Sequence, residues 1–290
     1  MAAGPLAGVR RILETPILDE HKWAKVPTLP TDAVLLDLED SVPPARKAEA
    51  RAAVVSYLAR PGFFAGRLAL PRPNPLGSPE GAADLAALAG AGVSVLAYPK
   101  ARSAEEVAEV GRVLRAHGAA PGLVVIVETA PAVLDLERIA RVPGVAGLIL
   151  GPADLADDVG WSLLDGEGVF ADAYHYPKSK LVLTGAAYGV PVYDTVFVAD
   201  LRDQAQVRRA VHHARRLGFT GMTTFYPPHL EVITEVFTPS AAEEAAAREV
   251  VAAYEAALAR GEAAVEVGGR AVIVQDYKAA LRTLGRAGPA

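Results

Sequence analysis

The feature that most constrains the fold is the alternation of short apolar runs with amphipathic stretches rich in alanine, arginine and glutamate. Apolar runs separated by helical patterns are typical of repeated βα units, in which parallel strands are buried on both faces. A sandwich or a helical bundle would not show this alternation. The pattern predicts eight strands, at residues 9–14, 33–39, 66–71, 93–100, 123–128, 145–151, 190–196 and 221–226.

Eight parallel strands within roughly 220 residues match the usual size of a (β/α)8 TIM barrel. A doubly wound open sheet is the alternative. Helical patterns lie between the strands, for example at 82–89, 104–117 and 201–217. We therefore predict a barrel domain over residues 1–238.

The pattern changes after the last predicted strand. A long helical pattern covers 241–259, a glycine-containing turn region covers 261–271, and a short helical pattern covers 275–284. This tail has too little apolar surface to be an independent domain. We predict a C-terminal helical extension over 239–290 that packs on the barrel or on a neighbouring subunit.

Composition narrows the class of protein. The 290 residues are 51% hydrophobic and carry a net charge of −5, which suits one large α/β domain and gives no general attraction for nucleic acid or an anionic membrane. The chain has no cysteine, which excludes a disulfide, a thiolate nucleophile and a cysteine-ligated zinc. The sequence shows no secretory signal pattern and no apolar stretch of membrane-spanning length, so we expect a cytoplasmic protein.

Two carboxylates follow neighbouring apolar runs: Glu128 after residues 122–127 and Asp154 shortly after residues 147–150. The carboxyl end of a barrel strand is where this fold carries its chemistry. Mg²⁺ usually takes one or two protein carboxylates and completes its octahedron with water and substrate oxygens. The pair therefore predicts a magnesium site. The structural alternative is that each acid caps the following helix, since acids favour helix N-termini.

Three further residues are candidates for catalysis. Arg72 ends the third predicted strand between two prolines. Its planar guanidinium can grip a substrate carboxylate or polarise a carbonyl, although it could instead pair with a nearby acid such as Asp37. Asp37 and Glu39 end the second strand and, two residues apart, point to one face, the inside or the mouth of a barrel. Buried like charges need partners, and we favour Glu39 over Asp37 for the site.

The turn Gly151-Pro152-Ala153 exposes backbone N–H groups that can hold a substrate carboxylate or an oxyanion. Lys100 ends the fourth strand, where pairing with an acid is favoured over a Schiff base. His21 and His229 fall near strand ends and remain open as acid/base candidates.

Several motifs occur together and in one order along the chain. They are Leu36-Asp-Leu-Glu-Asp-Ser-Val42, Arg72-Pro-Asn-Pro-Leu-Gly77, Tyr98-Pro-Lys100, Val127-Glu-Thr129, Gly151-Pro-Ala-Asp-Leu155 and Phe237-Thr-Pro-Ser240. In this combination the chain resembles the citrate lyase beta subunit-like family, within the HpcH/HpaI group of metal-dependent aldolases and lyases. The resemblance extends over nearly the whole chain.

The resemblance implies a (β/α)8 barrel with a C-terminal helical extension, assembled as a homotrimer or hexamer. It implies that Glu128 and Asp154 bind magnesium, that Arg72 contacts the substrate's carboxylate or carbonyl, and that Glu39 and Asp40 lie in the surrounding shell. Members of the family make or break a carbon–carbon bond beside a carbonyl, typically on acyl-CoA substrates. Magnesium and Arg72 would then stabilise the enolate formed when the bond breaks.

The chain departs from the family pattern in three places. Where the family has Phe-Val-Pro-Gly and then an arginine, this chain has Glu14-Thr-Pro-Ile-Leu-Asp19, a poorer seat for a CoA phosphate. Residues 225–229 replace a motif that often contains Ile-His-Pro-Ser-Gln. The aspartate that some malyl-CoA-type members place in the C-terminal segment falls at Ile273, with Asp276 displaced by three residues. We expect Glu14 and His21 to enter the site as substrate-contacting groups.

Three functions follow from these observations. The leading hypothesis is a magnesium-dependent carbon–carbon lyase or aldolase acting on a small oxo or hydroxy acid or on its CoA thioester. The second is a barrel of this family recruited to a specialised biosynthetic pathway, with a substrate that lacks CoA. The third is a catalytically silent binding or assembly subunit, which the intact Glu128, Asp154 and Arg72 disfavour.

Overall fold

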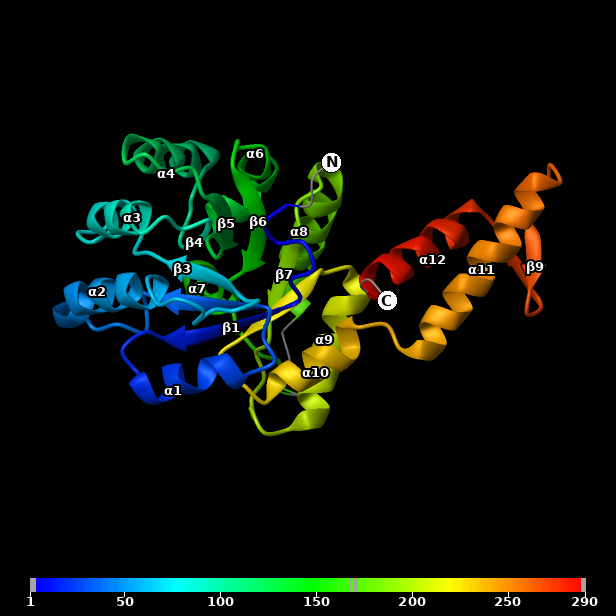
Figure 1. The fold of residues 1–290 in the computed structure, drawn as a ribbon, viewed down its shortest axis with the longest axis horizontal. Helices are drawn as coiled ribbons and strands as arrows, with labels where there is room; N and C mark the ends of the chain where they lie inside the picture. The colour runs from blue at the N-terminus through cyan, green and yellow to red at the C-terminus, as the bar shows by residue number, and fades with distance from the viewer. Residues whose placement is uncertain (1–3, 167, 169–171, 288–290) are drawn as a thin grey trace. The chain divides into compact units, whose positions relative to one another are not determined.

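The computed structural model describes residues 4–166, 168 and 172–287 and contains eight parallel strands in one sheet (Figure 1). The strand order is β3-β2-β1-β8-β7-β6-β5-β4, so the first strand pairs with the last, as a barrel requires and an open sheet does not. The predicted (β/α)8 fold is confirmed. The strands are β1 (Arg11–Pro16), β2 (Ala33–Asp37), β3 (Leu68–Arg72), β4 (Val95–Tyr98), β5 (Gly122–Val127), β6 (Val145–Leu150), β7 (Val192–Thr195) and β8 (Gly221–Thr224).

Helices follow the strands and lie outside them (Figure 1). Several begin at a side-chain cap, as in the helix capped by Ser103, whose hydroxyl accepts the N–H of Glu106. The helices of this part are α1 (Glu20–Lys25), α2 (Lys47–Leu58), α3 (Gly81–Gly90), α4 (Ala104–Ala116), α5 (Ala130–Leu134), α6 (Leu136–Ala140), α7 (Pro152–Val159), α8 (His175–Tyr188), α9 (Gln204–Leu217) and α10 (His229–Phe237). Short 3-10 turns occupy Val26–Thr28, Pro44–Arg46 and Asp172–Tyr174.

The strands divide the core into an inner and an outer layer. One cluster of buried residues fills the barrel and takes alternate positions of the strands, among them Ile12, Leu35, Leu70, Ile126 and Ile149. The intervening positions, such as Val34 and Leu36, pack against the outer helices in a second cluster. Because side chains alternate along a strand, the position two residues beyond each inner apolar residue also faces inward, at the carboxyl end of the barrel.

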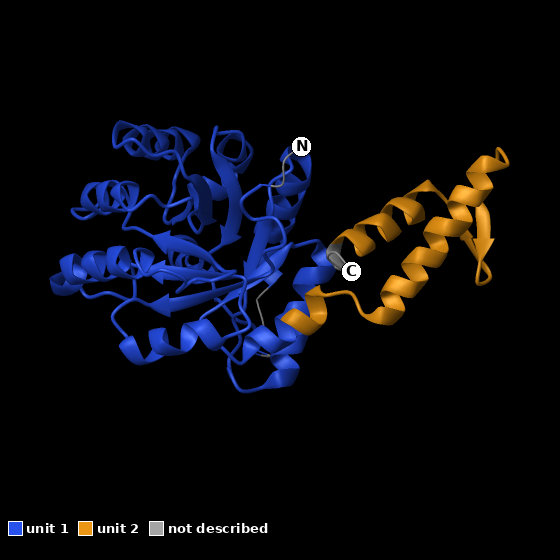
Figure 2. Ribbon diagram, viewed as in Figure 1, with its two compact units in different colours: residues 1–233 blue, residues 234–290 orange. Residues whose placement is uncertain are grey.

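The chain divides into two compact units, Met1–Ile233 and Thr234–Ala290 (Figure 2). The second unit contains α11 (Ala241–Ala259), β9 (Val265–Val267), β10 (Arg270–Val272) and α12 (Val274–Ala287). A capping box between Ser240 and Glu243 begins α11. The rings of Tyr254 in α11 and Tyr277 in α12 stack with their centroids 5.0 Å apart.

One prediction for this unit was incomplete, because residues 261–271 were expected to form turns alone. They contain the hairpin β9–β10, whose strands are joined by Gly268 and Gly269 at φ values of 57° and 78°. Two adjacent positive φ values are what a two-residue hairpin turn requires, and a Gly-Gly pair between short strands is its usual signal. In the described part of the chain, no helix is both long and apolar enough to cross a membrane.

Candidate active site

A polar layer lies directly above the apolar filling of the barrel. Two residues beyond Ile12, Leu35, Leu70 and Ile126, the inward positions hold Glu14, Asp37, Arg72 and Glu128. Three acids and one arginine therefore share the mouth at a single level. So many carboxylates in a confined space require cations or bound protons, because like charges raise one another's energy there.

Arg72 is held by the acids at the end of β2. Its Nε donates to Asp37 Oδ1 at 2.7 Å and lies 3.6 Å from Glu39 Oε2. The backbone N–H groups of Glu39 and Ser41 donate to the two oxygens of Asp37 at 2.9 Å each. Burial, the largest single influence, would raise the pKa of Asp37, but the charge and hydrogen bond of Arg72 outweigh it and lower this pKa to about 2. Asp37 is thus an ionised support that orients Arg72.

The loops after β2 and β3 are fixed by residues that the sequence did not single out for the site. Lys47 Nζ donates to the carbonyls of Leu38 and Glu39 and to Asn74 Oδ1, at 2.7 to 2.8 Å. Asn74 Nδ2 in turn donates to Asp84 Oδ2 at 2.6 Å and to Leu38 O at 2.9 Å. Lys47 thus binds backbone carbonyls at the end of β2 rather than a carboxylate. These hydrogen bonds hold the loops that carry Arg72 and Glu39 at the mouth of the barrel.

Glu128 lies at the end of β5 and is only 2% exposed. Its Oε1 accepts the backbone N–H of Lys100 at 2.6 Å. The following helix α5 is capped by the hydroxyl of Thr129, which accepts the N–H of Ala132, so the capping alternative is wrong for Glu128. Burial raises the pKa of Glu128 well above its usual value, and the charge of Asp154 raises it further. The two carboxylates are therefore electrostatic neighbours, as the magnesium interpretation requires.

Asp154 occupies the first turn of α7, so the preference of acids for helix N-termini also applies to it. Its carboxylate is partly exposed and lies 3.4 Å from Lys100 Nζ. Gly151, which precedes the helix, has no room for a side chain, because a Cβ there would lie 2.3 Å from Glu128 Oε2. The glycine thus lets Glu128 reach the space in front of α7.

Lys100 crosses this space from the end of β4. It is the one described non-glycine residue with positive φ, at 51°, which aims its N–H at Glu128. Its Nζ lies 2.6 Å from Glu39 Oε1 and 2.9 Å from Asp40 Oδ1. Burial alone would lower the pKa of Lys100, but its hydrogen bonds to Glu39 and Asp40 raise it overall. The expected pairing of Lys100 with an acid is confirmed.

Glu39 is the least satisfied of these acids. It is 4% exposed, and among the described residues its Oε2 has no hydrogen-bond partner. Burial raises the pKa of Glu39 to about 7, although Arg72 and Lys100 oppose the rise. A buried oxygen of this kind is expected to bind water or a ligand.

The arrangement of donors fits magnesium better than a metal held by protein alone. Within the described residues, no group of three or more histidine, aspartate or glutamate side chains could hold a metal ion. Glu128 and Asp154 offer two carboxylates beside Gly151, and Glu39 adds nearby an oxygen that accepts no hydrogen bond from the described residues. Magnesium takes one or two protein carboxylates and leaves corners of its octahedron for water and substrate.

The turn before α7 has less to offer an anion than the sequence suggested. The N–H of Gly151 donates to Val127 O at 3.1 Å, and Pro152 has no N–H. Of the three residues named for this role, Ala153 alone can present an N–H, from the open first turn of the helix.

The structure places the remaining candidates, Glu14, His21 and His229, in different surroundings. Glu14 enters the polar layer: its carboxyl hydrogen-bonds Thr223 of β8 and interacts electrostatically with Arg72. His21 is exposed on α1, where it interacts with Asp19. His229 is 1% exposed, and both ring nitrogens bind protein atoms, Nδ1 to Thr224 Oγ1 at 3.0 Å and Nε2 to Leu201 O at 2.9 Å. His229 was wrong as an acid/base candidate, because it is a bonded part of the core.

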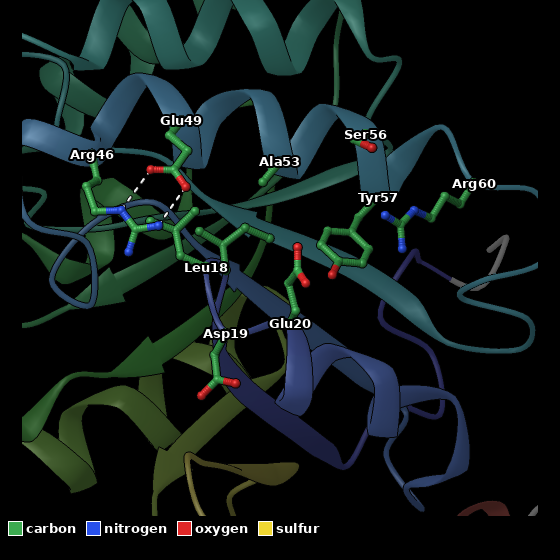
Figure 3. Close-up of a pocket in the computed structure, with 10 residues that line it drawn as sticks. Leu18, Asp19, Glu20, Arg46, Glu49, Ala53, Ser56, Tyr57 and Arg60 are labelled. Carbon is green, nitrogen blue, oxygen red and sulfur yellow. Dashed lines mark hydrogen bonds and ion pairs between the residues drawn. The ribbon is translucent and has the colours of Figure 1, made fainter.

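A pocket of about 710 Å³ lies beside the loop that follows β1 (Figure 3). Ile17, Leu18 and the α2 residues Ala53 and Tyr57 line it together with charged groups. Its carboxylates come from Asp19, Glu20 and Glu49, and its cations from Arg46 and Arg60. Arg46 is paired with Glu49, and the guanidinium of Arg60 lies 4.1 Å from the centre of the Tyr57 ring. This pocket has no excess of positive charge.

Comparison with known proteins agrees with the geometry. The model of the HpcH/HpaI aldolase/citrate lyase family matches residues 17–227. A (3S)-malyl-CoA thioesterase from Cereibacter sphaeroides is 31% identical over 280 residues, covering 96% of this chain and 94% of that protein. The L-malyl-CoA/beta-methylmalyl-CoA lyase of the same organism is 32% identical over 282 residues, covering 89% and 88%. Protein CitE from Mycobacterium tuberculosis, solved with magnesium, acetoacetate and coenzyme A, aligns with a TM-score of 0.81, 29% identity and 99% coverage of both chains.

A nearly closed βα barrel with a carboxylate-rich mouth is thus the fold and site of an enzyme class that includes aldolases and lyases. The chain belongs to the HpcH/HpaI aldolase/citrate lyase family. The family resemblance inferred from the motifs is confirmed, and the structural neighbour contains the metal that the sequence predicted.

Proposed function

We propose that this protein is a magnesium-dependent carbon–carbon lyase or aldolase that acts on a small oxo or hydroxy acid or on its CoA thioester. The supporting observation is the convergence of Glu128 and Asp154 on one space bounded by Arg72, Glu39 and Lys100. The magnesium in the related CitE structure supports the same assignment. Magnesium bound by Glu128 and Asp154 would supply positive charge beside the oxygen on which an enolate develops.

Residues of the chain itself bind and orient the substrate. Arg72, oriented by Asp37, offers its guanidinium to the substrate's carboxylate or carbonyl oxygen. Glu39 and Lys100 form an ion pair on the same side, which places a positive charge near the ligand without leaving it unpaired. Ala153 contributes an N–H from the first turn of α7. Together these groups bind an oxo acid by its oxygens and hold it in one orientation.

A second candidate function, supported by the pocket beside the β1–α1 loop, is the same chemistry on a substrate without CoA. Asp19 and Glu20 place carboxylates on this pocket, and the side chain of Glu20 points toward Tyr57 (Figure 3). Negative charges there repel phosphates, which the CoA portion of a thioester carries.

The family resemblance further leads us to propose that the protein forms a homotrimer or hexamer and is located in the cytoplasm.

Calorimetry with magnesium and an assay of carbon–carbon cleavage test the proposal together. We expect wild-type protein to bind magnesium and the variants Glu128→Gln and Asp154→Asn to lose this binding while keeping their thermal midpoints. Malyl-CoA, citryl-CoA and the corresponding free acids are then offered in parallel. Cleavage of free acids alone selects the second candidate, and no magnesium binding by the wild type would overturn both in favour of a silent barrel.

A further inference from the structure

On the basis of the proposed function, we infer that Glu14 is the catalytic acid and base of this site, exchanging a proton with the substrate carbon at the breaking bond. The inference rests on where β1 places this side chain, on its hydrogen-bond partners, and on the way the other titratable groups of the mouth are already used.

The strand order places Glu14 across the mouth from the metal-binding carboxylates. The end strands β3 and β4 contact each other and complete the circle, so β1 and β5 are four strands apart in either direction, which makes them opposite in a barrel of eight. Glu14 belongs to β1 and Glu128 follows β5, and both occupy the inward polar layer. A small acid held by its oxygens near Glu128 therefore turns its carbon chain toward Glu14.

Hydroxyl groups of β7 and β8 lie on the side of the mouth where Glu14 stands. Thr195 Oγ1 lies 2.7 Å from Leu150 O, and because a carbonyl can only accept, Thr195 donates there. Thr195 Oγ1 also lies 2.9 Å from Thr223 Oγ1. Thr223 hydrogen-bonds the carboxyl of Glu14, and this bond lowers the pKa of Glu14, so it stabilises the carboxylate.

Glu14 has the hydroxyl of Thr223 and the charge of Arg72 as neighbours. The other charges near it are the acids Asp37 and Asp40 at the end of β2. Burial, which is the largest influence, raises the pKa of Glu14, so this carboxyl binds a proton more readily than an exposed glutamate. Arg72 and Thr223 oppose this rise, so the carboxylate is also stabilised.

The other titratable groups of the described mouth are engaged elsewhere. Asp37 holds Arg72 with a pKa of about 2, and Glu39 is paired with Lys100. Glu128 and Asp154 are assigned to the metal, and both nitrogens of the nearby His229 are bonded to protein. Glu14 is the carboxyl group of this layer that has none of these tasks, and it is partly exposed.

The reaction balances with this single group. In cleavage, the carboxylate of Glu14 accepts the proton of the substrate's hydroxyl, which becomes a carbonyl while the electron pair of the carbon–carbon bond becomes the enolate. The acid form of Glu14 then gives this proton to the enolate carbon to form a C–H bond and is a carboxylate again. In the reverse direction the carboxylate of Glu14 removes a proton from that carbon. No oxidant, reductant or co-reactant is consumed.

Deuterium exchange into the methyl group of pyruvate, followed by proton NMR in D2O with magnesium present, tests this role. We expect exchange in the wild type and a loss of at least about 100-fold in Glu14→Gln, the usual contribution of a general acid or base. The amide introduced by this substitution can still hydrogen-bond Thr223, so the pyruvate Kd and the thermal midpoint should stay unchanged. Glu137→Gln, which removes an exposed carboxyl on α6, is the matched control and should exchange like the wild type.

Each outcome separates this inference from the proposed function. Equal exchange in the wild type and Glu14→Gln, or bound pyruvate that does not exchange in the wild type, overturns the role of Glu14 and leaves the metal site standing. Failure of the wild type to bind pyruvate with magnesium overturns the proposed function itself.

Infrared difference spectroscopy of the metal-free protein supplies a second readout. Wild type minus Glu14→Gln should show the carbonyl stretch of a protonated carboxylic acid at a pH just above the ordinary glutamate pKa of about 4.3, because the pKa of Glu14 is raised. A carboxylate band in its place would contradict the inference.

Discussion

Two opposite walls of the barrel mouth carry the same residue type in different surroundings. On the β5–β6 wall, Glu128 is buried beside a second carboxylate, Asp154, and receives a backbone N–H from Lys100. On the β1–β8 wall, Glu14 is partly buried, hydrogen-bonds Thr223 and lies near Arg72. Burial raises the pKa of both glutamates, but the strongest charge effect on Glu128 comes from the like charge of Asp154, which a dication would relieve, whereas the strongest on Glu14 comes from the positive charge of Arg72. The comparison indicates that the neighbouring groups, rather than the residue type, determine whether a glutamate is suited to bind a metal or to carry a proton.

The largest expected effect distinguishes the two walls directly. Glu128→Gln should weaken magnesium binding by at least about 100-fold, because changes even in the groups that orient metal ligands cost 10–100-fold. Glu14→Gln should leave magnesium affinity within about threefold of the wild type, since it touches no proposed ligand. Calorimetric titration of both variants provides the measurement. Equal losses in the two variants would show that the walls are not functionally separate.

A backbone substitution tests the same wall without changing a charge. In Gly151→Ala the added Cβ would lie 2.3 Å from Glu128 Oε2 and 2.6 Å from Glu128 Cβ, so Glu128 must move. We expect magnesium affinity to fall by about 10–100-fold and the free energy of unfolding to fall by about 1–3 kcal/mol. Gly90→Ala, where nothing lies within 4 Å of the new atom, is the matched control. Unchanged magnesium affinity in Gly151→Ala would argue against Glu128 as a ligand.

Arg72 interacts electrostatically with both Glu14 and Glu128. Arg72→Lys keeps the positive charge but removes the planar guanidinium group. The loss of one charged hydrogen bond should reduce kcat/KM by about 10–100-fold. Because Asp37 then loses its 2.7 Å contact with Nε, we also expect the site to bind pyruvate less tightly. Steady-state kinetics and calorimetry follow the two effects. A variant with wild-type kcat/KM would limit Arg72 to a structural ion pair.

The smallest effect concerns stability and pH. The pKa of Asp37 is lowered to about 2, so its ionised form stabilises the folded state above its ordinary value near 3.8, and this contribution is lost as the pH falls toward 2. The depression corresponds to about 2 kcal/mol. Asp37→Asn should therefore be less stable than the wild type at pH 6 by about this amount, with the difference shrinking below pH 4. Urea unfolding between pH 3 and 6 measures it, and a constant difference over this range would contradict the assignment.

Much of the architecture could be predicted because it depends on local patterns. Buried parallel strands are apolar throughout, so all eight were visible as short runs, and their ends were misplaced by no more than about two residues. The hairpin at Val265–Val272 was missed although Gly268 and Gly269 signalled it, since its strands have only three residues each. The predicted strand ends also place Glu128, Asp37 and Arg72 at one rim of the barrel.

The sequence by itself determined which residues lie at the carboxyl rim of the barrel, since that follows from strand periodicity and chain order. Only the tertiary structure decided what each of them faces. It paired Asp37 with Arg72, turned the backbone of Lys100 toward Glu128, and brought Thr223 from the last strand against Glu14 in the first. It also enclosed His229 within hydrogen bonds. The physical reason is that protonation and charge depend on burial and on neighbours distant in sequence, which become neighbours only when the barrel closes.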